Sequence, residues 1–170
     1  MSMRVNVHAT SIVLGKMAAA FEGPPDAAVL IFGESGSGKS DLALRLIAGG
    51  ALLVADDQTL LTMADGRLYA EAPETISGLI EIRGVGIVVV PFAKRAPIVL
   101  AIRLLTEGAP ERLPEPNLYV PPSPLVPPAQ PIPLIALHAF EASAPAKIAA
   151  SASSAANGRF IAGVTSEKCS

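Results

Sequence analysis

The stretch from Gly33 to Ser40 reads GESGSGKS and constrains the chain more than any other. Its glycines let backbone N–H groups converge on an anion without obstruction from Cβ atoms. The continuous apolar run from Ala27 to Phe32 predicts a buried strand before it, and Lys39 to Ala48, with apolar residues on one face, predicts a helix after it. A glycine loop between a strand and a helix is the pattern of a phosphate-binding loop (P-loop), so we expect an α/β protein that holds a nucleotide. The alternative, a glycine-serine turn without function, is disfavoured by the strand and helix around it.

Each residue of this loop has an expected role. The backbone amides would surround the phosphates, Lys39 would reach the β- and γ-phosphates, and the Ser40 hydroxyl would bind Mg²⁺. The predicted nucleotide-binding residues are therefore Gly33, Glu34, Ser35, Gly36, Ser37, Gly38, Lys39 and Ser40.

Two adjacent aspartates follow the loop closely. Asp56 and Asp57 come directly after a predicted strand, Leu52 to Ala55, 17 and 18 residues after Lys39. P-loop enzymes use an acidic residue at such a strand end to hold the metal or to orient the nucleophile. Because successive strand residues point to opposite sides, one carboxylate would accept a proton from an incoming hydroxyl while the other orders water around the metal. Alternatively, Asp57 only opens a turn into the following hairpin.

The rest of the chain fits one domain, because 170 residues is an ordinary length for a single core. We expect this domain to span residues 1–150, followed by a tail at 151–170 that is partly helical or mobile. Further strands are expected at 4–7, 11–14, 59–63, 67–71, 86–90, 98–105 and 134–140, and a last helix from 145, with Ser143 as its N-cap.

Ten of the sixteen prolines lie between residues 110 and 133. Proline lacks the backbone donor, so this region cannot be a central strand or a helix interior. It is either a linker or an extended segment held against the fold. The second interpretation is favoured by the apolar residues within it: Leu118, Tyr119, Val120, Leu125 and Val126.

Composition excludes several classes of function. A formal net charge of −2 gives no broad basic field for nucleic acid. The N-terminus lacks the apolar core of a signal peptide, and no apolar run approaches the roughly 20 residues that cross a bilayer. The single cysteine, Cys169, fits a reducing compartment. We therefore expect a soluble cytoplasmic protein without nucleic-acid or membrane partners.

Taken in order, GESGSGKS, the VADD aspartates and EIRGVGI at Glu81 to Ile87 resemble the catalytic domain of bacterial HPr kinase/phosphorylase. That enzyme phosphorylates a serine of the phosphocarrier protein HPr. The resemblance covers about residues 5–112 well and the rest loosely. It implies a P-loop kinase fold related to phosphoenolpyruvate carboxykinase, with a mixed sheet and flanking helices, ATP and Mg²⁺ as cofactors, and a homo-oligomer, typically a hexamer. The family's usual N-terminal domain has no counterpart here, so we expect the short form.

The resemblance also assigns roles to single residues. Asp56 is similar to the residue that takes the proton from the substrate serine. His8 would be structural if considered alone, but it is similar to an active-site histidine upstream of the P-loop. The implied catalytic residues are His8, Lys39, Asp56, Arg83 and Arg112, and the implied metal ligands are Ser40, Asp57 and Glu81.

The expected function is an ATP-dependent kinase acting on a serine of HPr or an HPr-like carrier. Whether the phosphorylase activity is retained stays open, because the family's basic stretch linked to dephosphorylation is replaced here by ALHAFEASAPAKI, in which His138 is taken as structural. Two alternatives remain: an ATP-binding regulatory or sensor module without phosphoryl transfer, and a small-molecule P-loop kinase.

Overall fold

The computed structural model describes residues 3–160. Its strands are β1 (Arg4–Val7), β2 (Thr10–Val13), β3 (Ala28–Phe32), β4 (Leu52–Ala55), β5 (Thr59–Ala64), β6 (Arg67–Glu71), β7 (Leu79–Ile82), β8 (Gly86–Val89), β9 (Arg95–Leu104) and β10 (Leu134–Leu137). Its helices are α1 (Lys39–Ala48) and α2 (Ala144–Ala156), with the 3₁₀ helices η1 (Gly15–Phe21) and η2 (Glu74–Ile76). The strand and helix expected around the glycine loop are confirmed.

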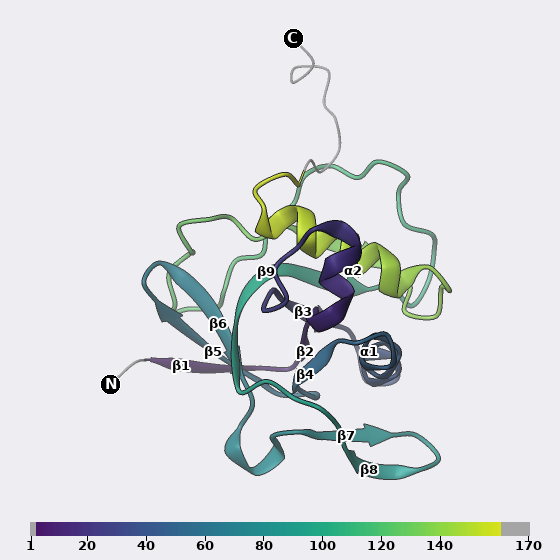
Figure 1. The fold of residues 1–170 in the computed structure, drawn as a ribbon. Coiled ribbons are helices and arrows are strands. Elements are labelled where there is room, and N and C mark those ends of the chain that lie inside the picture. Colours follow the sequence, from purple (N-terminus) through teal and green to yellow (C-terminus); the bar gives the residue numbers. More distant parts are fainter. Residues whose placement is uncertain (1–2, 161–170) are drawn as a thin grey trace.

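Eight strands form one strongly curved sheet in the order β1-β5-β6-β9-β3-β2-β4, with β10 also paired to β9 (Figure 1). The pairs β3–β9 and β9–β10 are parallel, and the other pairs are antiparallel. The long strand β9 meets β6 along its first residues and β10 along its last, which lets one strand serve two parts of the sheet. The mixed α/β architecture predicted from the sequence is therefore confirmed.

Strand β2 lies between the P-loop strand β3 and the strand β4, antiparallel to both. The strand that ends at the two aspartates is therefore not a hydrogen-bonded neighbour of the P-loop strand in the sheet. As a result, the residues just before β2 lie at the same edge of the sheet as the C-terminal ends of β3 and β4. Residues from the start of the chain thereby join the site.

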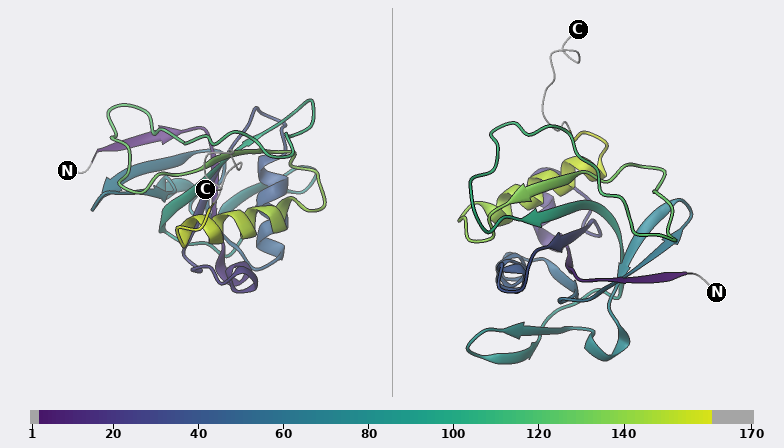
Figure 2. Two further views of the ribbon diagram at one scale, coloured as in Figure 1. Left: turned by 90° about the horizontal axis from the view of Figure 1, so that it is seen from above. Right: turned by 180° about the vertical axis from the view of Figure 1, so that it is seen from behind.

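The two faces of the sheet carry separate apolar cores. On one face, α1, α2 and η1 cover a cluster that includes Leu42, Leu46, Leu53, Ile102 and Ile148, all fully buried. On the other face there is no helical layer among the described residues, and the proline-rich segment covers that core instead. Figure 2 shows this segment and α2 on opposite sides of the strands.

The proline-rich segment forms no helix or strand between residues 105 and 133, within the described chain. It is extended and held against the fold, as one of the two interpretations predicted, because Leu125 and Ile132 are buried and Tyr119 packs beside them. Leu118, Val120 and Val126 are exposed, so the expectation that they also anchor the segment is wrong.

Some elements differ from the sequence-based expectation. The 3₁₀ helix η1 and the strand β7 were not predicted, and β9 begins three residues earlier than expected, at Arg95. Helix α2 follows Ser143, whose side chain makes no capping hydrogen bond, and continues past residue 150 to Ala156. The expected tail continues past residue 160, and Cys169 lies outside the described residues. Between residues 3 and 160, no helix is long and apolar enough to span a bilayer.

Candidate active site

The P-loop joins the C-terminal end of β3 to the N-terminus of α1. Gly38 precedes the helix with φ +96°, a conformation that residues with a Cβ rarely adopt. The Lys39 side chain is almost fully buried and folds back over the loop, where its ammonium donates to the carbonyl oxygens of Gly33 at 2.6 Å and Glu34 at 3.2 Å. These bonds hold the loop closed around the helix N-terminus, whose free N–H groups favour an anion.

Asp56 is the best-connected carboxylate of the site. Its Oδ1 accepts hydrogen bonds from Ser40 Oγ at 2.7 Å and from Thr10 Oγ1 at 3.2 Å, and its Oδ2 accepts one from the Glu81 backbone N–H at 3.1 Å. Asp56 therefore connects the P-loop serine, the strand β2 and the strand β7. A hydroxyl and a carboxylate in contact offer the oxygen ligands that Mg²⁺ prefers.

Asp57 lies in the turn that follows β4, with φ +65°. Its backbone N–H donates to Thr10 Oγ1 at 3.1 Å, and its Oδ1 lies 2.7 Å from His8 Nε2. Both side chains of this pair are about 60% exposed (60% and 59%). The turn predicted for Asp57 is present, and its carboxylate nevertheless faces the open side of the site.

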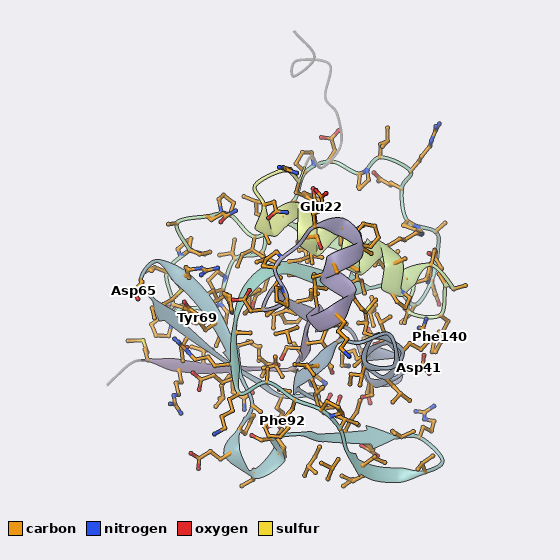
Figure 3. The ribbon with its side chains drawn as sticks, in the orientation of Figure 1. Glu22, Asp41, Asp65, Tyr69, Phe92 and Phe140 are labelled. Carbon is orange, nitrogen blue, oxygen red and sulfur yellow. The ribbon has the colours of Figure 1, made fainter. Side chains whose placement is uncertain are left out.

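A cleft of about 720 Å³ opens beside these residues. The P-loop and α1 form one wall, and the β7–β8 hairpin, which projects from the main sheet in Figure 1, forms the other. Asp41 and Phe140, labelled in Figure 3, both line this cleft. The cleft is lined by Ser35, Gly36, Gly38, Lys39, Ser40, Asp41, Leu44, Asp56, Asp57, Glu81, Ile82, Arg83, Gly84, Val85, Gly86 and Phe140.

Most of the predicted site residues lie in or next to this cleft. Lys39, Ser40, Asp56, Asp57, Glu81 and Arg83 line it, and His8 is joined to it through Asp57. Arg112 does not line it and is exposed in the proline-rich segment. His138 contacts the Gly108 carbonyl, as a structural residue would. Among residues 3–160, no group of three His, Cys, Asp or Glu side chains is assembled as a metal site.

Two residues that sequence reasoning missed belong to the site. Thr10 is fully buried and holds both aspartates, and Phe140 lines the cleft from the turn before α2. The sequence contains one indication that Thr10 belongs to the site, namely its position in VHATS two residues after His8. Its role depends on β2 lying between β3 and β4, which the local pattern does not encode.

The residues present fit a nucleotide with its metal. The buried Ser37 hydroxyl of the P-loop has no hydrogen-bond partner among residues 3–160, which leaves one unsatisfied donor at the loop. Ser40 and Asp56 supply oxygen ligands at the loop, and Glu81 adds a carboxylate across the cleft.

Comparisons with known proteins found similarity in sequence and in fold. Residues 25–94 match the sequence model of the HPr Serine kinase C-terminal domain. The chain is 44% identical to the HPr kinase/phosphorylase of Clostridium tetani over 77 residues, which is 45% of this chain and 25% of that protein. It is 53% identical to that of Caldicellulosiruptor bescii over 60 residues, 35% of this chain and 19% of that protein. The matched segment thus spans a quarter or less of these curated relatives.

The likeness extends further in three dimensions. The structure of the Hpr(Ser) kinase/phosphatase from Coxiella burnetii aligns with a TM-score of 0.63 and 27% sequence identity, covering 85% of this chain and 91% of that one. The resemblance to the HPr kinase catalytic domain is therefore confirmed, in sequence around the P-loop and in fold over most of the chain.

Proposed function

We propose that this chain is an ATP-dependent kinase that transfers a phosphoryl group to a serine of HPr or an HPr-like phosphocarrier protein. The proposal rests on two carboxylates beside one P-loop that have different partners. Asp56 accepts a hydrogen bond from Ser40 at 2.7 Å, and Asp57 lies 2.7 Å from His8. A site that only holds a nucleotide needs the first pair. The second pair gives the open side of the cleft a proton acceptor. The names of the similar proteins supply the substrate class.

Mg²⁺ and ATP would be held by the P-loop side of the cleft. The loop amides and Lys39 would bind the phosphates, and Ser40 and Asp56, with Glu81 opposite, would hold the metal, which when bound neutralises phosphate charge during transfer. Lys39 must exchange its two backbone carbonyl partners for phosphate oxygens, and both partners lie within the same loop.

The contacts favour roles for the two aspartates that differ from those expected by resemblance. Asp56 is tied to the P-loop serine and to two further donors, which suits a metal ligand and leaves little capacity to take a proton. Asp57 is open to solvent and has its carboxylate on His8. We therefore assign proton acceptance to Asp57 and metal binding to Asp56 with Ser40.

In this mechanism the residues of the chain position and deprotonate the substrate. Asp57 would accept a hydrogen bond from the substrate serine hydroxyl and then its proton, as the serine oxygen bonds to the γ-phosphorus and the bond between that phosphorus and the β-phosphate oxygen breaks, which would release ADP. His8 would hold the Asp57 carboxylate in position during this step. Lys39 on one wall and Arg83 on the other would stabilise the negative charge spread over the transferring group. Arg112 would need a rearrangement of its segment to take part. Retained phosphorylase activity and a homohexamer belong to the same proposal, by resemblance.

The proposal is tested with purified chain, HPr and ATP labelled on the γ-phosphate. We expect label on an HPr serine with the parent chain, none with Lys39→Met, and full labelling with Lys16→Met, a matched change at an exposed lysine outside the cleft. Bound ATP without labelled HPr would contradict the kinase assignment and favour the sensor module. Label on a small molecule in place of HPr would favour the small-molecule kinase. Incubating phosphorylated HPr with inorganic phosphate tests the reverse reaction.

A further inference from the structure

Phe140 is an exposed aromatic side chain at the edge of the P-loop. It lies in the turn between β10 and α2, is 70% exposed, and lines the same cleft as Lys39 and Ser40. Its ring lies against Gly38, since a Cβ on that glycine would come 2.8 Å from the Phe140 Cζ. Its exposed position beside an anion-binding loop leaves the ring available to a ligand whose anionic group binds at that loop.

The turn that carries Phe140 is firmly held. The guanidinium of Arg45, on α1, donates to the backbone carbonyl of Ala139 and, at 3.3 Å, to that of Glu141. The Glu141 carboxylate accepts a hydrogen bond from Lys147 on α2 at 2.6 Å, which lowers the pKa of Glu141. Both residues that flank Phe140 are therefore anchored, one of them to both helices, and the ring has a fixed place relative to the P-loop.

The shape of the cleft separates the parts of a nucleotide. The loop amides and the start of α1 can bind only the phosphates, so the sugar and base must extend into the remainder of the 720 Å³ cleft. Among the described residues that line it, Phe140 is the only aromatic one, and the other large apolar side chains are Leu44 on α1 and Ile82 and Val85 on the opposite wall. Nucleobases stack on such rings, and stacking tolerates every base because each has a π-face.

We propose that Phe140 is the stacking platform for the base of the bound nucleoside triphosphate, with Leu44 beside it. The inference rests on the proposed nucleotide binding at the P-loop and adds the subsite for the base. Because the ring lies outside the phosphate loop, its removal weakens binding of ATP and leaves binding of inorganic tripolyphosphate unchanged. Because stacking alone does not select among bases, the affinities for ATP and GTP fall together.

The test measures dissociation constants by calorimetry for Mg·ATP, Mg·GTP and Mg·tripolyphosphate. For Phe140→Ala we expect ATP and GTP to bind roughly 5- to 100-fold more weakly, the range of aromatic–base stacking, and tripolyphosphate to bind as in the parent. Phe140→Tyr keeps the ring and restores ATP binding. Phe21→Ala, a matched change at a partly exposed phenylalanine on η1 outside the cleft, leaves all three affinities unchanged.

A second readout uses the absence of tryptophan from the chain. In Phe140→Trp the single indole lies at the proposed platform, and we expect ATP to quench its fluorescence and tripolyphosphate to leave it unchanged. An equal loss of ATP and tripolyphosphate in Phe140→Ala would mean that the ring only supports the loop at Gly38, and the inference would fall. Unchanged ATP binding would also overturn it. Failure of the parent chain to bind either ligand would instead remove the proposed function, and this inference with it.

Discussion

His8 Nε2 and Asp57 Oδ1 lie 2.7 Å apart, although His8 precedes the P-loop and Asp57 follows it. The contact arises because β2 is inserted between β3 and β4, so that the residues just before β2 reach the end of β4. It gives one of two neighbouring carboxylates a partner that the other does not have. The two aspartates are therefore expected to respond differently to the same substitution.

Replacing Asp57 with Asn should lower kcat for HPr phosphorylation by about 100-fold or more, the usual contribution of a general base, and leave the affinity for Mg·ATP nearly unchanged. Replacing Asp56 with Asn should instead weaken Mg²⁺-dependent nucleotide binding. It removes the negative charge of the carboxylate that accepts the hydrogen bond from the Ser40 hydroxyl, where the metal would bind. Steady-state kinetics and calorimetry measure both effects.

Asp65→Asn is the matched control, since Asp65 also has a positive φ, +51°, but lies in the β5–β6 turn. It should change neither kcat nor affinity. The opposite pattern, in which D56N retains Mg·ATP affinity and loses turnover while D57N loses binding, would return the proton-acceptor role to Asp56.

Thr10→Val should lower the free energy of unfolding by about 1–2 kcal/mol, because the buried Thr10 hydroxyl donates to Asp56 and accepts from the Asp57 N–H. Thr62→Val is the control. Thr62 is buried on β5, but its hydroxyl has no hydrogen-bond partner, so this change should be neutral or stabilising. Urea unfolding measures both; equal destabilisation would mean that the Thr10 bonds contribute nothing beyond packing.

Leu125→Ala should destabilise the chain by about 2 kcal/mol, because Leu125 fills the core on the helix-free face of the sheet. Val126→Ala, at a 63% exposed neighbour, should stay within about 0.5 kcal/mol of the parent. The comparison uses melting temperatures and the rate of proteolysis within residues 110–133. If both variants behave alike, the segment is a linker rather than a covering layer.

The proline-rich segment should also make the fold sensitive to alkaline pH. Burial raises the pKa of Tyr119 from 10 to about 12. The unfolded chain then loses the Tyr119 proton before the folded chain does, so this stability contribution is complete below pH 10 and is lost as pH rises toward 12. Tyr119→Phe should show a smaller fall in unfolding free energy between pH 9 and 11.5. Parallel curves for parent and variant would contradict this assignment.

The sequence predicted those parts of the fold whose signals are local. The strands β3, β5 and β6 and the helix α1 each depend on a few consecutive residues, and the structure has all four. It did not predict η1, a 3₁₀ helix of small and apolar residues without a capping signal, or β7, a strand of four residues. Such short elements are stabilised by what they pack against, which a linear pattern does not contain.

The site divides in the same way. Lys39 and Ser40 could be named from the P-loop pattern, and the aspartate pair could be named from its place at the end of the next predicted strand. Thr10 and Phe140 could not, because they enter the site through strand order and through the turn after β10. The different roles proposed for Asp56 and Asp57 depend on the side chains that each one contacts, which the sequence does not show for two adjacent residues.

The strand β3 that precedes the P-loop pairs on one side with β2 and on the other with β9, which lies some 70 residues later in the chain. Closing so large a loop costs chain entropy before the parallel pairing stabilises it, which slows folding. We therefore expect the P-loop strand to gain its second partner only after β9 has been synthesised. A ligand that binds only the complete pocket would stabilise only the completely folded chain. A fragment limited to residues 25–94 would contain the P-loop but would lack β9, the strand that pairs with β3.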